Sequence, residues 1–467
     1  MGLRNFKWKR AAAALAAALA AVALCFVMAA DSGGSLGASG KRGASDSAND
    51  CNMQNAFNSA DGNGKLSAFN GENGYSELDA YSGEFFSLGT IITVTVYAAD
   101  GEFAAGALDA AESVFRRVHG EMGRFEAGGD VYRINAATQQ EKPVKVGEET
   151  FALLQRAIGY CAQSGGAFDI GIGAASDLWG FGGGVGPRPD GQLQYLPDEQ
   201  TPPSPDERKP PSAGDLAAAL NNGGYDKIIL DGRNLTVGTP AGLVIDLGGI
   251  AKGYATQAAV EALKKYGVKS ALINAGGNIY AVGHKPAGGA AAGTGQTGGA
   301  AAGTKAAGED LAGGNMGGAG MATGSITSAG MATGAGAPDG ARLWNIGVRH
   351  PRPGVSDASG VGLLAAVAVA DKAVVTSGDY ERYFEYGGRR YHHILDPSTG
   401  WPPDATVSVT VISEDSVLAD YLSTAIFVLG KEKGLELAAE YPGVEALVVD
   451  AGLGVAASPG FNGVIYE

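Results

Sequence analysis

The chain has 467 residues, of which 45% are apolar, and its formal net charge is −15. This length is enough for one large domain or two medium ones. The acidic balance, without a basic stripe to meet phosphates, excludes nucleic acid as a partner, although a bound metal ion or a helix N-terminus still allows a nucleotide or flavin to bind.

Residues 1–30 have the pattern of an export signal or a membrane anchor. Four basic residues precede an uncharged, Ala-rich run over 11–30, which is long enough to span a bilayer. The segment 27–29 offers a cleavage site, whereas Leu24 makes a poor lipoprotein box before Cys25. A cleaved signal, an uncleaved anchor and a lipidated Cys25 stay open as alternatives. All three predict an extracytoplasmic protein associated with the outer face of the cell membrane.

The composition separates a tether from a folded part. Residues 31–81 are rich in Gly, Ser, Asn and Asp, which predicts a flexible linker, and we expect ordered chain from about Glu84. A single domain is predicted over 82–467, with insertions at 184–212 and 285–341. The second insertion is almost wholly Gly, Ala, Thr and Met, so it buries too little apolar surface to offset its ordering entropy, and we expect disorder there.

Hydrophobic periodicity predicts strands and helices in irregular order. The expected strands are 85–86, 91–96, segments near Ile228 and Val237, 243–245, 270–273, 278–282, 344–348, 363–370, 373–376, 381–385, 405–412 and a pair within 445–457. The expected helices are 102–121, 151–163, 216–220, 251–266, 414–429 and 431–440. Without a regular βαβ alternation, this predicts an α+β fold with mixed or antiparallel sheets and packed helices.

Two connections are also expected. The strands at 279–282 and 344–348 flank the Gly-rich insertion, and we expect them to be the two arms of one hairpin. A long insertion in a surface loop is thermodynamically tolerable. The Pro-rich stretch 187–211 is expected to be a surface loop.

A glycine-rich segment, 246–253, joins an expected strand to an expected helix. Glycines at such a junction let the backbone approach a ligand, and the helix N-terminus favours anions, to which Lys252 adds a positive charge. The segment is not a dinucleotide fingerprint, and it is not a P-loop because Tyr254 follows Gly253. A glycine-rich turn with Asp246 as a cap explains the segment equally well.

Asp420 and Thr424 lie four residues apart on the expected helix 414–429, so they stack on one side of it. A carboxylate and a hydroxyl together are hard oxygen ligands suited to Mg²⁺. An ordinary polar flank of the helix is the competing interpretation of the pair.

The segments 376–384 and 391–400 concentrate proton-transfer groups. Two of the five histidines, His392 and His393, are adjacent here and precede a turn that begins with Asp396. An imidazole beside carboxylates and hydroxyls is typical of a site that moves a proton next to a charged ligand. Upstream, the aromatic segment 178–182 either packs on a planar ring or fills a core.

Together and in this order, these segments resemble one family, the FAD:protein FMN transferases, also called ApbE-type flavin transferases. The resemblance covers about 84–467 apart from the two insertions. The matching segments are 122–125, 132–135, 168–171, 178–182, 245–254, 273–278, 344–347, 376–384, 391–400 and 418–424.

The resemblance implies a single catalytic domain that binds FAD and Mg²⁺ and cleaves the pyrophosphate. FMN is then attached through a phosphoester to a Thr or Ser of an exported acceptor protein, and AMP leaves. A metal that neutralises two phosphates and a base that takes the hydroxyl proton are what this reaction requires.

The resemblance also implies the site residues. Asp420 and Thr424 would ligate Mg²⁺ together with the carbonyl of Gly249, and His393 would be the base. The residues implied to contact FAD are Phe125, Trp179, Gly180, Phe181, Asp246, Lys252 and Ile394. One departure from the family is Glu126, where a small polar residue is usual.

Two other functions compete with this interpretation. An exported FAD-binding protein or a Mg²⁺-dependent FAD pyrophosphatase would use the same pocket, with water replacing the acceptor hydroxyl. A surface adhesion module is suggested by the glycine-rich segments, but it predicts no bound nucleotide and leaves His393, Asp420 and Thr424 unexplained.

Overall fold

The computed structural model describes the following residues: 78–138, 142–181, 185–187, 193–195, 208–286, 341–352 and 362–466. They belong to one unit, Gly71–Glu467. The expected signal or anchor, nearly all of the tether and most of both insertions lie outside the described residues. Among the described residues, no helix is long and apolar enough to cross a membrane.

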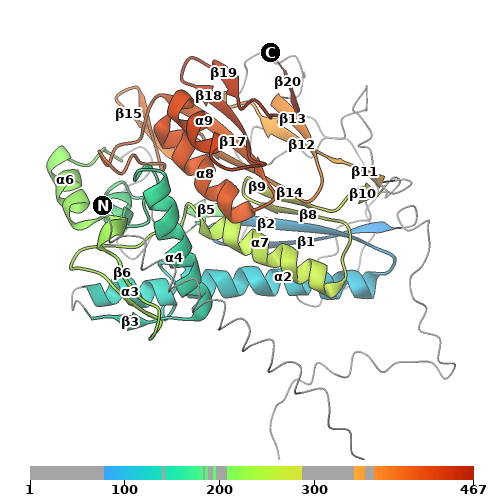
Figure 1. Ribbon diagram of the computed structural model, residues 1–467, viewed down its shortest axis with the longest axis horizontal. Helices are drawn as coiled ribbons and strands as arrows, with labels where there is room; N and C mark the ends of the chain where they lie inside the picture. Colours follow the sequence, from blue (N-terminus) through green and yellow to red (C-terminus); the bar gives the residue numbers. More distant parts are fainter. Residues whose placement is uncertain are drawn as a thin grey trace, which may run out of the picture. The chain divides into compact units, whose positions relative to one another are not determined.

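An antiparallel sheet of eight strands organises the unit (Figure 1). In spatial order its strands are β1 (Asp79–Ser87), β2 (Thr90–Ala98), β8 (Ala271–Ala275), β9 (Asn278–Val282), β14 (Lys372–Gly378), β17 (Thr406–Ser413), β18 (Glu445–Asp450) and β19 (Val455–Ala457). The two-residue turn between β1 and β2 places Leu88 and Gly89 at positive φ, 50° and 72°, as hairpins of this length require.

Four helices lie side by side on one face of this sheet: α2 (Gly101–Met122), α7 (Ala251–Tyr266), α8 (Ser416–Leu429) and α9 (Lys431–Ala439). Strand alternation creates the face they cover. On β2, Ile92, Val94 and Val96 belong to the core under the helices, whereas Tyr97 belongs to a cluster on the opposite face.

A three-stranded sheet packs on the opposite face. It consists of β12 (Trp344–Arg349), β13 (Leu363–Val369) and β20 (Gly463–Ile465). Tyr97 of the large sheet meets Trp344 edge to face, with ring centroids 5.8 Å apart. The large sheet is therefore covered on both faces, which explains why every residue of β17 is buried.

Most of the remaining elements lie at one end of the helical layer, whereas the short strand pair β10 (Lys285–Pro286) and β11 (Ala341–Arg342) lies on the opposite side of the unit (Figure 1). The helical ones are α3 (Asp130–Ala137), α4 (Glu148–Gln163), α5 (Gly173–Leu178), α6 (Ala213–Asn222) and η4 (Tyr225–Lys227). The other strands are β3 (Val144–Lys145), β4 (Val185–Pro187), β5 (Leu193–Tyr195), β6 (Ile229–Asp231), β7 (Thr236–Gly238), β15 (Tyr383–Tyr386) and β16 (Arg389–His392). On α4, Tyr160 stacks on Tyr421 of α8, with ring centroids 4.2 Å apart.

The α+β prediction is confirmed by the antiparallel sheets and packed helices, but three local expectations need correction. The segment 243–245 is no strand: only Val244 makes an isolated bridge, to Ile172. The Pro-rich stretch expected as a loop contains strand residues of the pair β4–β5. Ordered chain begins earlier than Glu84, because β1 pairs with β2 from Asp79 onward; the polar start of this edge strand carries little apolar signal.

The prediction that 279–282 and 344–348 form the two arms of one hairpin is wrong. β9 pairs with β8 and β14, whereas β12 pairs with β13 in the other sheet. The chain turns at Gly283, whose φ is 55°, and the short strands β10 and β11 form the actual pair, with Pro286 opposite Ala341.

Candidate active site

The N-terminus of α7 meets the middle of α8. The N–H of Gly253 donates a 2.8 Å hydrogen bond to Oδ2 of Asp420. A Cβ atom at Gly253 would lie 2.4 Å from the carbonyl oxygen of Ser416 and 2.7 Å from Cβ of Asp420. Only glycine therefore lets the helices approach this closely, and the approach brings a carboxylate to a helix N-terminus.

The three predicted metal ligands come together at this point. Asp420 is 3% exposed, and Oγ1 of Thr424 donates to its carbonyl oxygen at 3.4 Å. A Cβ atom on Gly249 would lie 3.5 Å from Oγ1 of Thr424 and 3.0 Å from the ring of Phe168. The loop before α7 thus lies against the polar side of α8.

Lys252 adds a positive charge to the same place. Its Nζ lies 3.8 Å from Oδ1 of Asp420 and donates to the carbonyl of Gly248 at 3.1 Å. Among the described residues, no group of three or more His, Cys, Asp or Glu side chains is placed to hold a metal. The oxygen donors here are of mixed kind: a carboxylate, a hydroxyl and backbone carbonyls.

Arg124 is a site residue to which the sequence interpretation assigned no role. Its guanidinium donates to Oδ2 of Asp246 at 2.9 Å, pairs with Asp177 and covers the exposed ring of Phe125 at 4.7 Å. Burial raises the pKa of Asp246, but the charge of Arg124 and the N–H of Gly248 outweigh that effect, so the pKa lies below its ordinary value. Asp246 is therefore ionised near neutral pH, and its carboxylate is held in place by Arg124.

Glu126, the departure from the family pattern, has a partner of its own. Its Oε1 lies 2.9 Å from Nε2 of His119, whose Nδ1 accepts the N–H of Leu88 at 3.3 Å. The carboxylate is thereby held against the end of α2.

His393 is half-buried and its tautomer follows from one contact. Nδ1 lies 3.3 Å from the carbonyl oxygen of Arg382, which only accepts, so Nδ1 carries the proton and Nε2 has the free lone pair. Burial first, then the charges of Arg382, His392 and Lys252, hold the pKa of His393 well below its ordinary value. The imidazole is therefore neutral near pH 7 and able to accept a proton.

The neighbouring His392 has a structural environment. It is buried against the ring of Phe427, and Nε2 donates to the carbonyl of Pro403 at 2.9 Å. Burial lowers its pKa. Of the two adjacent histidines, His393 is the one whose ring lies beside that of another predicted site residue, Phe181.

Trp179 and Phe181 of the aromatic segment 178–182 fill a small core in this structure, whereas Leu178 is exposed. Trp179 and Phe181 are 2% and 5% exposed, and Nε1 of Trp179 donates to the carbonyl of Gly400 at 2.8 Å. Gly180 lies between them at a φ of 67°. The ring of Phe181 is 6.5 Å from that of His393, centroid to centroid. Ile394 is buried in the core under the helices.

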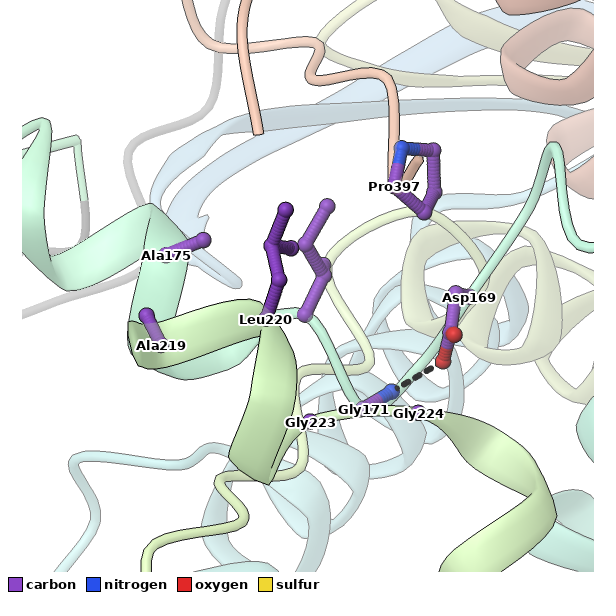
Figure 2. A pocket seen from close by; sticks show the side chains of 9 residues that line it. Asp169, Gly171, Ala175, Ala219, Leu220, Gly223, Gly224 and Pro397 are labelled. Carbon is purple, nitrogen blue, oxygen red and sulfur yellow. Dashed lines mark hydrogen bonds between the residues drawn. The ribbon is translucent and has the colours of Figure 1, made fainter. Parts of the chain in front are cut away.

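A cavity of about 50 Å³ lies between α5, α6 and Pro397 (Figure 2). Asp169 faces it and accepts the N–H of Gly171 at 2.7 Å, while burial raises the pKa of this carboxyl. The cavity has room for a few waters, not for a flavin. No predicted site residue lines it, so it is separate from the group around Asp420.

The antiparallel α+β core thus brings charged groups of both signs to the N-terminus of α7. The family model for the ApbE family matches residues 88–293 and 298–448. The chain belongs to the ApbE family. A relative in Treponema pallidum, named FAD:protein FMN transferase, is 33% identical over 80% of this chain and 85% of its own length. A Klebsiella pneumoniae relative of the same name is 28% identical over 78% of this chain and 86% of its own.

Solved structures agree with this assignment. The ApbE protein of Thermotoga maritima is similar with a TM-score of 0.60 and 28% identity, covering 82% of this chain and 97% of its own. The flavinyl transferase ApbE of Pseudomonas stutzeri has a TM-score of 0.57 and 26% identity, covering 82% and 95%.

Proposed function

We propose that this protein transfers the FMN moiety of FAD to a Thr or Ser hydroxyl of an exported acceptor protein, with Mg²⁺ and with release of AMP. Relatives named FAD:protein FMN transferase that match most of the chain support the flavin transfer. The observation that carries the proposal is the convergence of Gly249, Asp420 and Thr424 at the N-terminus of α7.

The residues present suit Mg²⁺. Asp420 offers a buried carboxylate, and Thr424 directs its own proton to a carbonyl, which leaves lone pairs on Oγ1 for a cation. A side chain on Gly249 would fill the space beside that oxygen. Mg²⁺ takes few protein ligands together with water and phosphate oxygens. When bound, it neutralises the pyrophosphate charge and so supports departure of AMP.

The chain's own residues bind and orient the substrate. We assign FAD contacts to Phe125, Trp179, Gly180, Phe181, Asp246, Lys252 and Ile394. The N-terminus of α7 and the ammonium of Lys252 provide positive potential for phosphate oxygens. Since Trp179 and Phe181 pack against other rings here, a flavin contact from them would be made at an edge or after a side-chain shift.

His393 is the group we assign to proton transfer. Its lone pair on Nε2 accepts the proton of the acceptor hydroxyl as that oxygen bonds to the phosphorus of the FMN phosphate. The bond from this phosphorus to the oxygen shared with AMP breaks, and AMP leaves with the electron pair. An imidazole that is neutral near pH 7 suits this step.

The acceptor is expected outside the cytoplasm. Residues 1–30 have the pattern of a signal or anchor, so the enzyme would be membrane-associated and would meet exported electron-transfer proteins there.

Mass spectrometry tests the proposal. The protein is incubated with FAD, Mg²⁺ and an acceptor domain from a neighbouring gene that carries an Asp-x-x-x-Ser/Thr motif. A mass gain of one FMN less water on a Ser or Thr, with AMP released, is expected. Free FMN and AMP with unmodified acceptor would show FAD pyrophosphatase activity, and unconsumed FAD would leave only a binding role.

A further inference from the structure

Lys252 occupies a position that is electrostatically unfavourable for a lysine. It is the second residue of α7, where the helix dipole places partial positive charge. Its side chain is 21% exposed, with the ammonium 3.8 Å from Oδ1 of Asp420. The position is tolerable because Asp420 supplies the opposite charge.

Asp420 needs that charge in turn. The residue is 3% exposed, and its other oxygen is occupied by the N–H of Gly253 at 2.8 Å. A carboxylate buried to this degree is costly unless it is paired. In the protein without metal, Lys252 is the cation that pairs with it.

A divalent cation bound by Asp420, Thr424 and Gly249 would compete with Lys252 for the same carboxylate. The ammonium would then face two added positive charges across a few ångströms, a strong repulsion at a shielded site. The lysine stem is flexible and its ammonium is a compact point charge, so it can move to another anion. The phosphates of a nucleotide at the N-terminus of α7 are such an anion.

We propose that Lys252 is an exchangeable counter-ion, which pairs with Asp420 in the metal-free protein and moves to the nucleotide phosphates when a divalent cation binds. This rests on the proposed function, specifically on the metal site. The consequence is that the metal and the nucleotide bind cooperatively. The metal binds weakly until a phosphate accepts the ammonium of Lys252, and by reciprocity the nucleotide binds weakly until the metal displaces that ammonium from Asp420. The protein would then load the metal and the nucleotide together.

Mn²⁺ binding to the full chain, measured by electron paramagnetic resonance, tests the exchange. Without nucleotide, Lys252→Met is expected to bind Mn²⁺ about tenfold more tightly than the wild type. With ADP, which has phosphates but no flavin to transfer, the wild type should gain affinity and Lys252→Met should gain much less. Lys265→Met, which removes the same charge at the other end of α7, should match the wild type.

Two further variants, Lys252→Arg and Asp420→Asn, distinguish a failure of the exchange from a failure of the proposed metal site. Lys252→Arg keeps the positive charge, so it should bind Mn²⁺ no more tightly than the wild type; tighter binding would overturn the charge argument. Equal affinity of Lys252→Met and wild type without ADP would overturn the exchange. If Asp420→Asn and wild type bind Mn²⁺ equally with ADP present, the metal site of the proposed function is wrong, and the exchange falls with it.

Discussion

Gly253 and Asp420, 167 positions apart in the sequence, are joined by a 2.8 Å hydrogen bond from the N–H of one to Oδ2 of the other. α7 lacks a side-chain cap from its own N-cap residue, Ile250, so a carboxylate from α8 satisfies this N–H instead. The bond connects the glycine-rich loop to the helix carrying Asp420 and Thr424. The site therefore depends on how closely the two helices approach.

Gly253→Ala should destabilise the protein by about 1–3 kcal/mol, because the added methyl meets backbone and side-chain atoms that have little room to move. Urea unfolding measures the change. Gly159→Ala on α4 is the matched control: nothing lies within 4 Å of its added Cβ, so it should be neutral or stabilising by up to about 1 kcal/mol. Equal effects of the two substitutions would show that the helix contact is not tight.

Asp420→Asn should reduce transfer at least about 100-fold, because the amide keeps an acceptor for Gly253 but removes the charge that holds a cation. Steady-state rates against Mg²⁺ concentration provide the measurement. Asp404→Asn, an exposed carboxylate near β16, serves as the control and should behave as the wild type. Wild-type Mg²⁺ dependence in Asp420→Asn would remove the ligand assignment.

His393→Gln should keep FAD binding and lose transfer by about 100- to 10,000-fold, the usual contribution of a general base. FAD fluorescence titration reports binding, and acceptor mass reports transfer. His392→Gln is a less direct comparison, since His392 is buried and bonded to Pro403; it is expected to lower stability more than transfer chemistry. Undiminished transfer in His393→Gln would rule out the base.

Arg382→Gln should move the acidic limb of the kcat/KM profile to higher pH. Burial and the charges of Arg382, His392 and Lys252 hold the pKa of His393 well below its ordinary value. Removing one positive charge makes the imidazolium less unfavourable, so the pKa rises and the base form is lost at a higher pH. Arg389→Gln, whose charge is not among the causes of this shift, should leave the limb in place; a wild-type profile in Arg382→Gln would contradict the assignment.

Local periodicity was sufficient to predict the main helices. The observed bounds of α7, Ala251–Tyr266, are those expected, because the apolar period ends at Gly267, which takes a φ of 107°. Spacing also predicted that Asp420 and Thr424 share one side of α8, since a four-residue separation fixes a shared helix side. Their role as metal ligands came from the family resemblance and stays a prediction.

What the sequence could not supply is contact between distant segments. The ion pair of Arg124 with Asp246 spans 122 positions, and no periodicity within either segment reports it. The hairpin prediction failed for the same reason: β9 and β12 are each apolar strands, but sheet partners depend on which faces the whole chain buries. The choice between a ring-stacking and a core role for Trp179 likewise required the surrounding rings.

Replacing residues 287–340 with a short glycine-containing turn should leave the fold and FAD affinity intact. Pro286 and Ala341 are paired across β10 and β11, so the ends to be joined already lie opposite each other, and a turn of two to five residues closes such a pair. Because loop-closure entropy grows slowly with length, the shortening itself should change the free energy of unfolding by only about 2–3 kcal/mol, in the stabilising direction. Thermal unfolding and FAD titration measure both properties. An insoluble product, or one with weakened FAD binding, would show that the insertion contributes to the folded domain or its site. Wild-type stability and FAD affinity combined with reduced transfer would show that the insertion helps to bind the acceptor protein.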